Sequence, residues 1–299
     1  MNRLLARLRH RLRTFFGLES LSAAITQTIA ELKMVSGIRP HRPTYAYLGN
    51  HRGLVVLHDG SRIFVDTRDL SLAPSLIVYG YWERWIDIVV TRLTRPGAVA
   101  VDLGANFGYY TLAMARASGP TGRIYAFEAN PDIASLLADT IVINGLDERV
   151  ALQNVAIMDR CTPIELSVPS GHMGGGHIFS ALVDSTHHRH AVEGLTLCDA
   201  LPDVTRIDIL RMDIEGCEPL ALKGAEPLIR ASPDLVIISE WRVEMMEFQC
   251  DVAEFVDWLG QLGFAFWEIR VDSTLEPVTP AGMLLLAPCD VVISRRRPF

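Results

Sequence analysis

The sequence predicts an α/β protein in which helices cover both faces of a mostly parallel sheet. At residues 98–115, a short apolar strand pattern leads through a glycine-bearing turn into a helix pattern. Strand and helix patterns then alternate over residues 123–262. The chain ends with two strand-like runs that no helix pattern separates. Strands that alternate with helices of this length are typical of a parallel sheet.

The first predicted strand and the turn after it, at residues 98–110, form the central element of the predicted fold. Val99 and Val101 alternate with alanines directly after Pro96-Gly97, which indicates a buried strand. Two turn glycines follow, and a helix begins near Tyr110. This geometry lets backbone N–H groups at a helix N-terminus approach a small charged ligand. The residues expected to form the turn and contact the ligand are Asp102, Gly104, Asn106, Phe107 and Gly108.

The alternating part of the chain gives the remaining elements. Pro131 is typical of the first turn of a helix, and Asn144-Gly145 of a helix end. The runs 264–271 and 283–294 are predicted to form an antiparallel hairpin at one edge of the sheet. The expected strands are 123–127, 150–157, 207–212 and 235–238, and the expected helices are 131–142, 220–229 and 252–262.

An N-terminal extension over residues 1–80 is predicted to precede the main domain, 81–299. Residues 1–36 show two amphipathic helix patterns, and residues 43–66 show three short β-type runs that indicate a small antiparallel sheet. The first helix is rich in arginine. It is expected to pack on the body of the protein or on a second subunit, or alternatively to contact an anionic membrane through residues 1–18.

A long insertion interrupts the alternation between the third and fourth strands, at 163–197. It contains a Gly174-Gly175-Gly176 run and most of the histidines, and it is expected to be irregular. Long insertions in compact domains are usually functional or mobile. We therefore expect this insertion, together with the small N-terminal sheet, to determine which substrate the protein accepts.

Charge and composition exclude several classes of function. The formal net charge of −7 argues against a nucleic-acid partner, which needs a basic face. Five scattered cysteines without a C-x-x-C pair fit free thiols in a reducing compartment. No stretch reaches the roughly 20 apolar residues of a membrane span. The expected location is the cytoplasm, with the inner face of the membrane as the alternative.

Polar side chains follow the strands at the edge where a parallel sheet binds its ligands. Glu128 follows the second strand, and its carboxylate is suited to accept hydrogen bonds from both ribose hydroxyls. The turn reads D-x-G-x-N-x-G rather than the G-x-G-x-x-G of dinucleotide sites, which favours a ligand with an amino-acid end over a diphosphate. The other strand-end candidates are Asn154 to Ile157, Asp213, Glu215, Glu218, Glu240 and Trp241.

Several of these segments resemble one known family. They are D-L-G-A-N-F-G-Y-Y at 102–110, A-F-E-A-N-P at 126–131, T-L-C-D-A-L at 196–201, D-I-L-R-M-D-I-E-G-C-E at 208–218 and L-K-G-A at 222–225. In this order they resemble the FkbM-type family of S-adenosylmethionine-dependent methyltransferases. The chain departs from the family at Ala129, where a Glu-Pro pair is usual, and at Cys198, which leaves the role of Asp199 open.

The resemblance implies a Rossmann-like class I methyltransferase with a seven-stranded sheet whose last strand is antiparallel. It implies S-adenosylmethionine as the cofactor and a hydroxyl of a sugar, glycan or polyketide-like metabolite as the acceptor. Asp102 and the backbone of Gly104 to Gly108 would hold the methionine part of the cofactor. Glu128 beside Ala129 would hold the ribose, and Asn154 to Ala156 would lie near the adenine.

Two sets of side chains are candidates for catalysis. Asp213 and Glu215 are expected to face the transferred methyl group, with Asp213 also near the cofactor. Either is suited to act as general base on a hydroxyl or as a ligand of a divalent ion such as Mg²⁺. His172 and His177, in the glycine-rich insertion, are the alternative bases. Glu218 is expected mainly to cap a helix, and Trp241 and Tyr109 to pack.

Two other functions compete with methyl transfer. A cofactor-binding protein without turnover, recruited to a membrane by its N-terminal helix, would keep the same turn and acids. An NAD-dependent oxidoreductase would need a G-x-G-x-x-G turn and a second mononucleotide-binding half, and the sequence contains neither.

Overall fold

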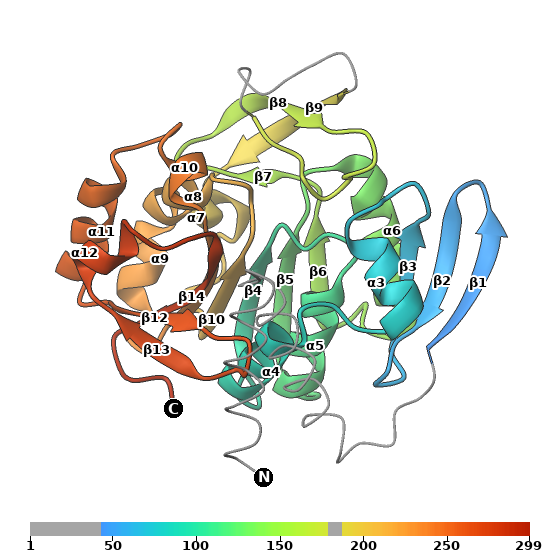
Figure 1. Cartoon of the computed structure of the whole chain (residues 1–299), viewed down its shortest axis with the longest axis horizontal. Helices are drawn as coiled ribbons and strands as arrows, with labels where there is room; N and C mark the ends of the chain where they lie inside the picture. Colours follow the sequence, from blue (N-terminus) through green and yellow to red (C-terminus); the bar gives the residue numbers. More distant parts are fainter. Residues whose placement is uncertain (1–42, 179–186) are drawn as a thin grey trace, which may run out of the picture.

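The computed structural model describes residues 43–178 and 187–299. Within them, an eight-stranded sheet has the strand order β13-β12-β14-β11-β10-β4-β5-β6 (Figure 1). Strands β6, β5, β4, β10 and β11 run parallel, and β14 runs antiparallel to both of its neighbours. The predicted α/β class, with a mostly parallel sheet and antiparallel strands at one end, is therefore confirmed. The sheet has eight strands rather than the expected seven, because β13 adds a further strand at the edge beside β12. The predicted helices over 1–36 and the membrane contact of residues 1–18 lie outside the described residues.

The strands of the main sheet are short. Strand β4 alternates its side chains between two hydrophobic cores, because Ala100 belongs to one core and Val101 to the other. The chain adds strands on one side of β4 first (β5, β6) and then on the other (β10, β11). Where the strand order reverses in this way, a crevice is expected at the carboxyl ends of the two central strands, here β4 and β10. The strands are β4 (Val99–Leu103), β5 (Arg123–Phe127), β6 (Val150–Gln153), β10 (Ile209–Met212), β11 (Val236–Trp241), β12 (Ala265–Ile269), β13 (Leu275–Val278) and β14 (Cys289–Ser294).

Helices cover both faces of this sheet (Figure 1). The first core lies between the sheet and α4 (Arg84–Leu93), α5 (Tyr109–Ser118) and α6 (Pro131–Ile143). Helix α6 begins as predicted: Pro131 is its first residue, and the side chain of Asn130 accepts a hydrogen bond from the Asp132 N–H. The second core is formed with α7 (Leu197–Ala200), α8 (Glu218–Gly224), α9 (Glu226–Ala231) and α11 (Val252–Gln261).

The predicted small antiparallel sheet is also confirmed. It consists of β1 (Thr44–Gly49), β2 (Arg52–Val56) and β3 (Arg62–Asp66), and it lies beside α6. Thr140 on α6 accepts a hydrogen bond from the backbone N–H of Phe64, at 3.0 Å. Val55, Ile63 and Val65 are buried in the first core together with residues of the main sheet. A helix that was not predicted, α3 (Leu72–Tyr79), connects this sheet to α4.

Several predicted boundaries are wrong. The third strand ends at Gln153, because the Asn154 side chain donates to the carbonyls of Glu128 and Ala129, and β7 (Ala156–Ile157) joins another sheet. The predicted helix 220–229 is two helices, α8 and α9. Pro227 lacks the N–H that a continuous helix needs, and Gly224 packs against the carbonyl of Met158. Strand β11 continues to Trp241, so Glu240 belongs to the strand.

The insertion and the end of the chain are more regular than expected. Residues 163–197 are not simply irregular, because β8 (Thr162–Val168) and β9 (His188–Leu195) pair antiparallel, and β9 pairs parallel with β7. This three-stranded sheet lies above the carboxyl ends of the main strands (Figure 1). At the end of the chain, β13 and α12 (Pro280–Met283) separate β12 from β14, and β14 lies between β11 and β12 rather than at the edge. The remaining short helix is α10 (Val243–Met246).

Candidate active site

The turn between β4 and α5 crosses very close to the segment that follows β10. Gly104 has a φ of +71°, and a Cβ atom at this position would lie 2.0 Å from the carbonyl oxygen of Asp213. Only glycine permits this approach. Asn106 also takes a left-handed conformation, with φ of +52°. Left-handed backbone conformations at residues other than glycine are found most often at functional sites.

Glu128, at the end of β5, fixes this turn. One carboxylate oxygen accepts the N–H of Asn106 and the other accepts the N–H of Asn130, both at 2.8 Å. The residue is 7% exposed, and burial raises the pKa of its carboxyl to about 7, although the two N–H donors act in the opposite direction. Each carboxylate oxygen has two lone pairs, so both oxygens keep capacity to accept from a ligand.

Glu128 lines a first cavity of about 620 Å³ at the carboxyl ends of the central strands. Its wall is largely apolar and includes Val155, Ile157 and Met173. Of the predicted site residues, this cavity is lined by Gly104, Glu128, Ala129, Ala156, His177, Asp213 and Glu215.

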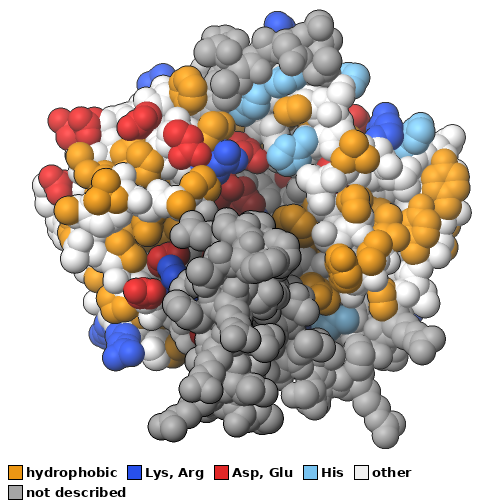
Figure 2. Space-filling view, in the orientation of Figure 1, with side chains coloured by type: hydrophobic (Ala, Val, Ile, Leu, Met, Phe, Trp, Pro, Cys, Tyr) orange, Lys and Arg blue, Asp and Glu red, His pale blue; other side chains and the backbone are white. Residues whose placement is uncertain are grey.

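A second cavity of about 560 Å³ adjoins the first on the other side of the turn. Three aromatic side chains line it, from Trp82, Tyr109 and Tyr110, together with His172 and Arg211. Residues common to both linings are Gly104, Gly174, Asp213 and Glu215. The two acids therefore stand where the cavities meet, and Figure 2 shows acidic side chains gathered in the hollow of this face.

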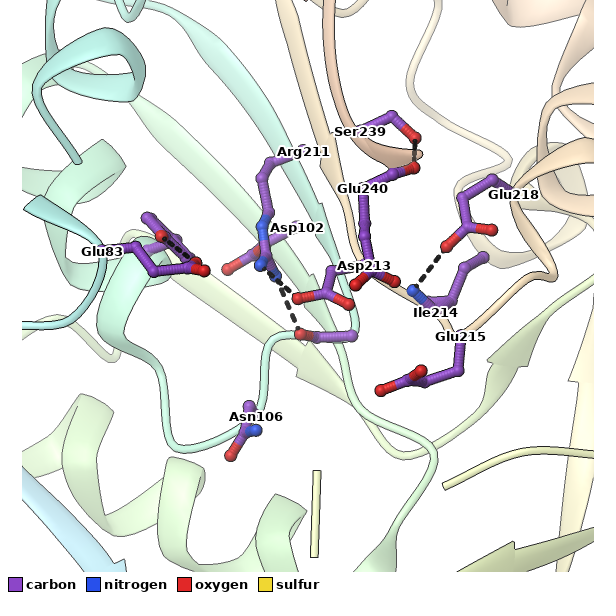
Figure 3. A network of polar contacts seen from close by, with 12 residues as sticks. Glu83, Asp102, Asn106, Arg211, Asp213, Ile214, Glu215, Glu218, Ser239 and Glu240 are labelled. Carbon is purple, nitrogen blue, oxygen red and sulfur yellow. Dashed lines mark hydrogen bonds and ion pairs between the residues drawn. The ribbon is translucent and has the colours of Figure 1, made fainter. Parts of the chain in front are cut away.

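Arg211 organises the charges behind this junction (Figure 3). Its guanidinium donates to Asp213 at 2.8 Å and to the carbonyl of Gly104 at 3.1 Å, and lies 3.7 Å from Asp102. It also stacks on the Tyr110 ring, 4.4 Å from the ring centroid. The Asp102 side chain is fully buried, accepts a hydrogen bond from Thr111 and lines neither cavity. Asp102 therefore lies behind Arg211, which itself lines the second cavity.

Glu83 joins the same network and was not found from the sequence. It precedes α4 with a φ of +32°, and its carboxylate accepts the Tyr110 hydroxyl at 3.1 Å. Burial, followed by the charge of Asp213, raises the pKa of Glu83 to about 7. In the sequence, the only sign of its importance is that Glu83 lies between Trp82 and Trp85. Its hydrogen-bond partner, Tyr110, is 27 residues away in α5, so the sequence around Glu83 does not reveal the contact.

Glu215 combines strain, burial and access to both cavities. Its φ is +53°, and Gly216 follows with +88°. Burial and then the charge of Asp213 raise the pKa of Glu215 to about 7, while Arg242, at 3.4 Å, acts in the opposite direction. The same causes raise the pKa of Glu240 to about 10. At neutral pH, this acidic region therefore holds carboxyls that keep or share a proton.

Part of the insertion lies over the turn. A Cβ atom at Gly174 would lie 2.1 Å from the side-chain nitrogen of Asn106. The buried carboxylate of Asp69 accepts the N–H of Met173 at 3.2 Å with one oxygen and, with the other, the N–H groups of Leu72 and Ala73 at the start of α3. Asp69 therefore connects α3 to the glycine-rich loop that borders both cavities.

Replacing Asp69 by alanine is expected to lower the free energy of unfolding by about 0.5–2 kcal/mol, as for other lost helix caps. It should also speed hydrogen exchange at the Met173 amide, because that N–H loses its acceptor. Asp251→Ala is the control, since the Asp251 carboxylate also accepts two backbone N–H groups at the start of a helix, those of Ala253 and Glu254 in α11. Equal exchange at Met173 in both variants would contradict the connection.

The other predicted site residues lie in different places. His177 lines the first cavity, where burial lowers its pKa, and its ring centroid is 5.3 Å from that of His187. Phe107 is fully buried and, like Gly108 and Asn154, lines neither cavity. Glu218 begins α8 and accepts the Ile214 N–H. Trp241 is buried against Phe255.

Asp213 and Glu215 are also predicted as alternative ligands of a divalent ion. Over residues 43–178 and 187–299, no group of three or more His, Cys, Asp or Glu side chains is arranged to hold a metal ion. The same residues contain no helix with the length and apolar character of a bilayer span.

Comparison with known proteins identifies the family. The model described as "Methyltransferase FkbM domain" matches residues 102–266, more than half of the chain. The chain belongs to the FkbM methyltransferase family. The match includes the β4–α5 turn, Glu128, Arg211 and both acids at the cavity junction. No relative was found among curated protein sequences.

Solved structures similar to this FkbM methyltransferase are distant from it. The FkbM methyltransferase of Methylobacillus flagellatus is 14% identical with a TM-score of 0.41, and the alignment covers 66% of this chain and 43% of that one. This chain thus spans less than half the length of that protein. An O-methyltransferase of Bacillus cereus, crystallised in complex with SAH, is 12% identical with a TM-score of 0.42 over 96% of each chain.

Proposed function

We propose that this FkbM methyltransferase transfers a methyl group from S-adenosylmethionine to a hydroxyl of a sugar, glycan or polyketide-like metabolite. One observation carries the proposal. Two cavities adjoin at the carboxylates of Asp213 and Glu215, and the first cavity is also lined by Glu128, whose carboxylate can accept hydrogen bonds from ribose hydroxyls. Separate compartments for cofactor and acceptor, with acids where they meet, are what a two-substrate transfer requires.

We assign the first cavity to the cofactor. The carboxylate of Glu128 can accept hydrogen bonds from the ribose hydroxyls, and the apolar wall around Val155 and Ile157 suits the adenine ring. Gly104 and Gly174 leave room at the turn for the methionine part, beside Asp213. The bound cofactor supplies an electrophilic methyl group on a sulfonium. The negative charge of the neighbouring carboxylates favours a positive ligand.

Replacing Glu128 by alanine is expected to weaken binding of S-adenosylhomocysteine by about 1.5–3 kcal/mol, roughly 10- to 150-fold. The variant loses a charge-assisted acceptor and also leaves the N–H groups of Asn106 and Asn130 without their partner. Isothermal titration calorimetry measures the change. Glu165→Ala is the control, because Glu165 lies on β8 with an exposed side chain paired to Arg189. Unchanged affinity in Glu128→Ala would contradict the assignment of the first cavity.

The second cavity is assigned to the acceptor. Aromatic faces such as those of Trp82 and Tyr110 pack against sugar rings and flat apolar scaffolds. We assign Glu215 as the general base, because a base is most effective when its pKa lies near the working pH. Asp213 instead pairs with Arg211 at 2.8 Å, a contact that holds its side chain in place at the junction of the cavities. His172 is the alternative base in the acceptor cavity.

Transfer of a tritiated methyl group to a panel of sugars and natural-product alcohols tests the proposed reaction directly. We expect transfer to at least one hydroxyl acceptor, and parallel reactions with and without EDTA show whether a divalent ion takes part. Calorimetry with S-adenosylmethionine and S-adenosylhomocysteine tests the cofactor separately. A folded protein that binds neither at high micromolar concentration would refute the proposal. The cytoplasm, where its free thiols stay reduced, is the location we propose.

A further inference from the structure

A second group of charged side chains lies at the other end of the main sheet. It surrounds a hollow of about 500 Å³ between the end of α4, the start of β11 and the segment after β14. Both cavities of the active site are at the carboxyl ends of the parallel strands, whereas the start of β11 is an amino end. The hollow is therefore separate from the site of methyl transfer.

The lining of this hollow is strongly basic. It contains Arg92, Arg95, Arg295, Arg296 and Arg297, and its one acid is Asp234. Five positive charges against one negative charge stand out in a chain whose formal net charge is −7. We call this feature the arginine hollow.

Three of the arginines already have partners. Arg295 is held in place because it donates to the carbonyls of Leu262, Ser232 and Ile229 and stacks on Phe264. Arg296 pairs with Asp234 at 2.9 Å, and Arg92 stacks on the ring of Phe299. These contacts fix the positions of guanidinium groups around the hollow and cancel only one of the five charges.

The other two arginines keep their full charge. Arg95 and Arg297 are exposed, and neither makes an ion pair or a side-chain hydrogen bond with any residue of the described chain. Like charges gathered this closely repel one another, so an anion that enters the hollow relieves that repulsion. The planar fork of N–H donors on a guanidinium matches the oxygens of a phosphate.

We propose that the arginine hollow binds the phosphate group of an anionic ligand, with Arg95 and Arg297 as the main contacts. A phosphate carries up to two charges and several strong acceptor oxygens, so it satisfies two guanidinium groups at once, which a single carboxylate does less well. The group can belong to a free phosphate ester or to a lipid headgroup. Neither source requires the methyl-transfer reaction.

Calorimetry with sodium pyrophosphate at low salt, on the full chain, is the first test. We expect saturable binding that Arg95→Gln/Arg297→Gln weakens at least tenfold. The double variant Arg160→Gln/Arg189→Gln removes two other exposed arginines, beside and within the β7-β9-β8 sheet, and should bind pyrophosphate as the original protein does. Equal thermal unfolding midpoints and equal affinity for S-adenosylhomocysteine show that the folds and the active site are intact.

Sedimentation with vesicles distinguishes the two sources of phosphate. Phosphatidylcholine vesicles with and without phosphatidic acid are compared. Binding to the acidic vesicles that Arg95→Gln/Arg297→Gln abolishes indicates a lipid headgroup, and pyrophosphate binding without it indicates a free ligand. Absence of both, or binding that both double variants alter equally, overturns the proposal. These outcomes do not depend on whether methyl transfer is observed.

Discussion

Replacing Glu215 by glutamine is expected to lower kcat by about 10²–10⁴-fold, the usual contribution of a general base. The carboxylate borders both cavities, where it can take the proton that the acceptor hydroxyl must lose. Glutamine keeps the size of the side chain and tolerates the local φ as glutamate does, but it cannot accept the proton. Affinity for S-adenosylhomocysteine should change by no more than roughly threefold, because Glu128 and the turn remain intact.

The dependence of the rate on pH separates this role from a structural one. A base works only after it has lost its own proton, so kcat/KM should rise with pH through about 7, where the carboxyl of Glu215 titrates. Glu215→Gln should lose this acidic limb. Glu244→Gln is the control, since Glu244 also lies beside Arg242, at 3.6 Å, but lines neither cavity. An acidic limb that persists unchanged in Glu215→Gln would contradict the assignment of Glu215 as the general base.

Replacing Arg211 by methionine is expected to lower the free energy of unfolding by about 3–5 kcal/mol, the typical cost of removing one partner of a buried ion pair. Arg211 is 5% exposed, and its loss leaves the fully buried Asp102 and the acid Asp213 without their cation. Urea unfolding measures the change. Lysine is not an equivalent replacement, because one ammonium cannot reach Asp213 and Gly104 with the fork of a guanidinium.

A second variant distinguishes lost charge pairing from lost packing. Asp102→Asn combined with Arg211→Met removes the fully buried acid together with its partner, so part of the lost stability should return. The contrary outcome is that the double variant loses as much free energy of unfolding as the two single variants lose when added together. In that case, the loss comes from the packing of Arg211 against Tyr110 rather than from the charges.

The parallel core could be predicted because its signals are local. Pro96-Gly97 marks the start of the first strand, and the cap and proline at Asn130-Pro131 mark the start of α6. Glu128 could be predicted for the same reason, since a strand pattern ends directly before it. These residues determine their own backbone conformation, so a single sequence is enough to find them.

The rest depends on contacts between residues that are distant in the sequence. In the sequence, Arg211 is a single charged residue in an apolar strand. Its neighbours in the sequence do not show that its guanidinium contacts Asp102, Asp213 and the Tyr110 ring. Pairing of β7 with β9 joins residues 38 apart, and β14 enters the sheet beside β11 after five intervening elements. Pro227 is a local signal for the break between α8 and α9. The regular spacing of the apolar residues across 220–229 nevertheless favours a single helix, so the break was not predicted.

The attachment of the small sheet to α6 limits how the chain can be shortened for recombinant work. Besides Phe64 and Thr140, Arg52 pairs with Asp139 on the same helix, and Asn144 at its end bonds to both backbone groups of Arg62. A fragment that begins at residue 81 would expose the side of α6 that these strands cover, so we expect it to aggregate. Expression trials should therefore retain every residue from Pro43 onward.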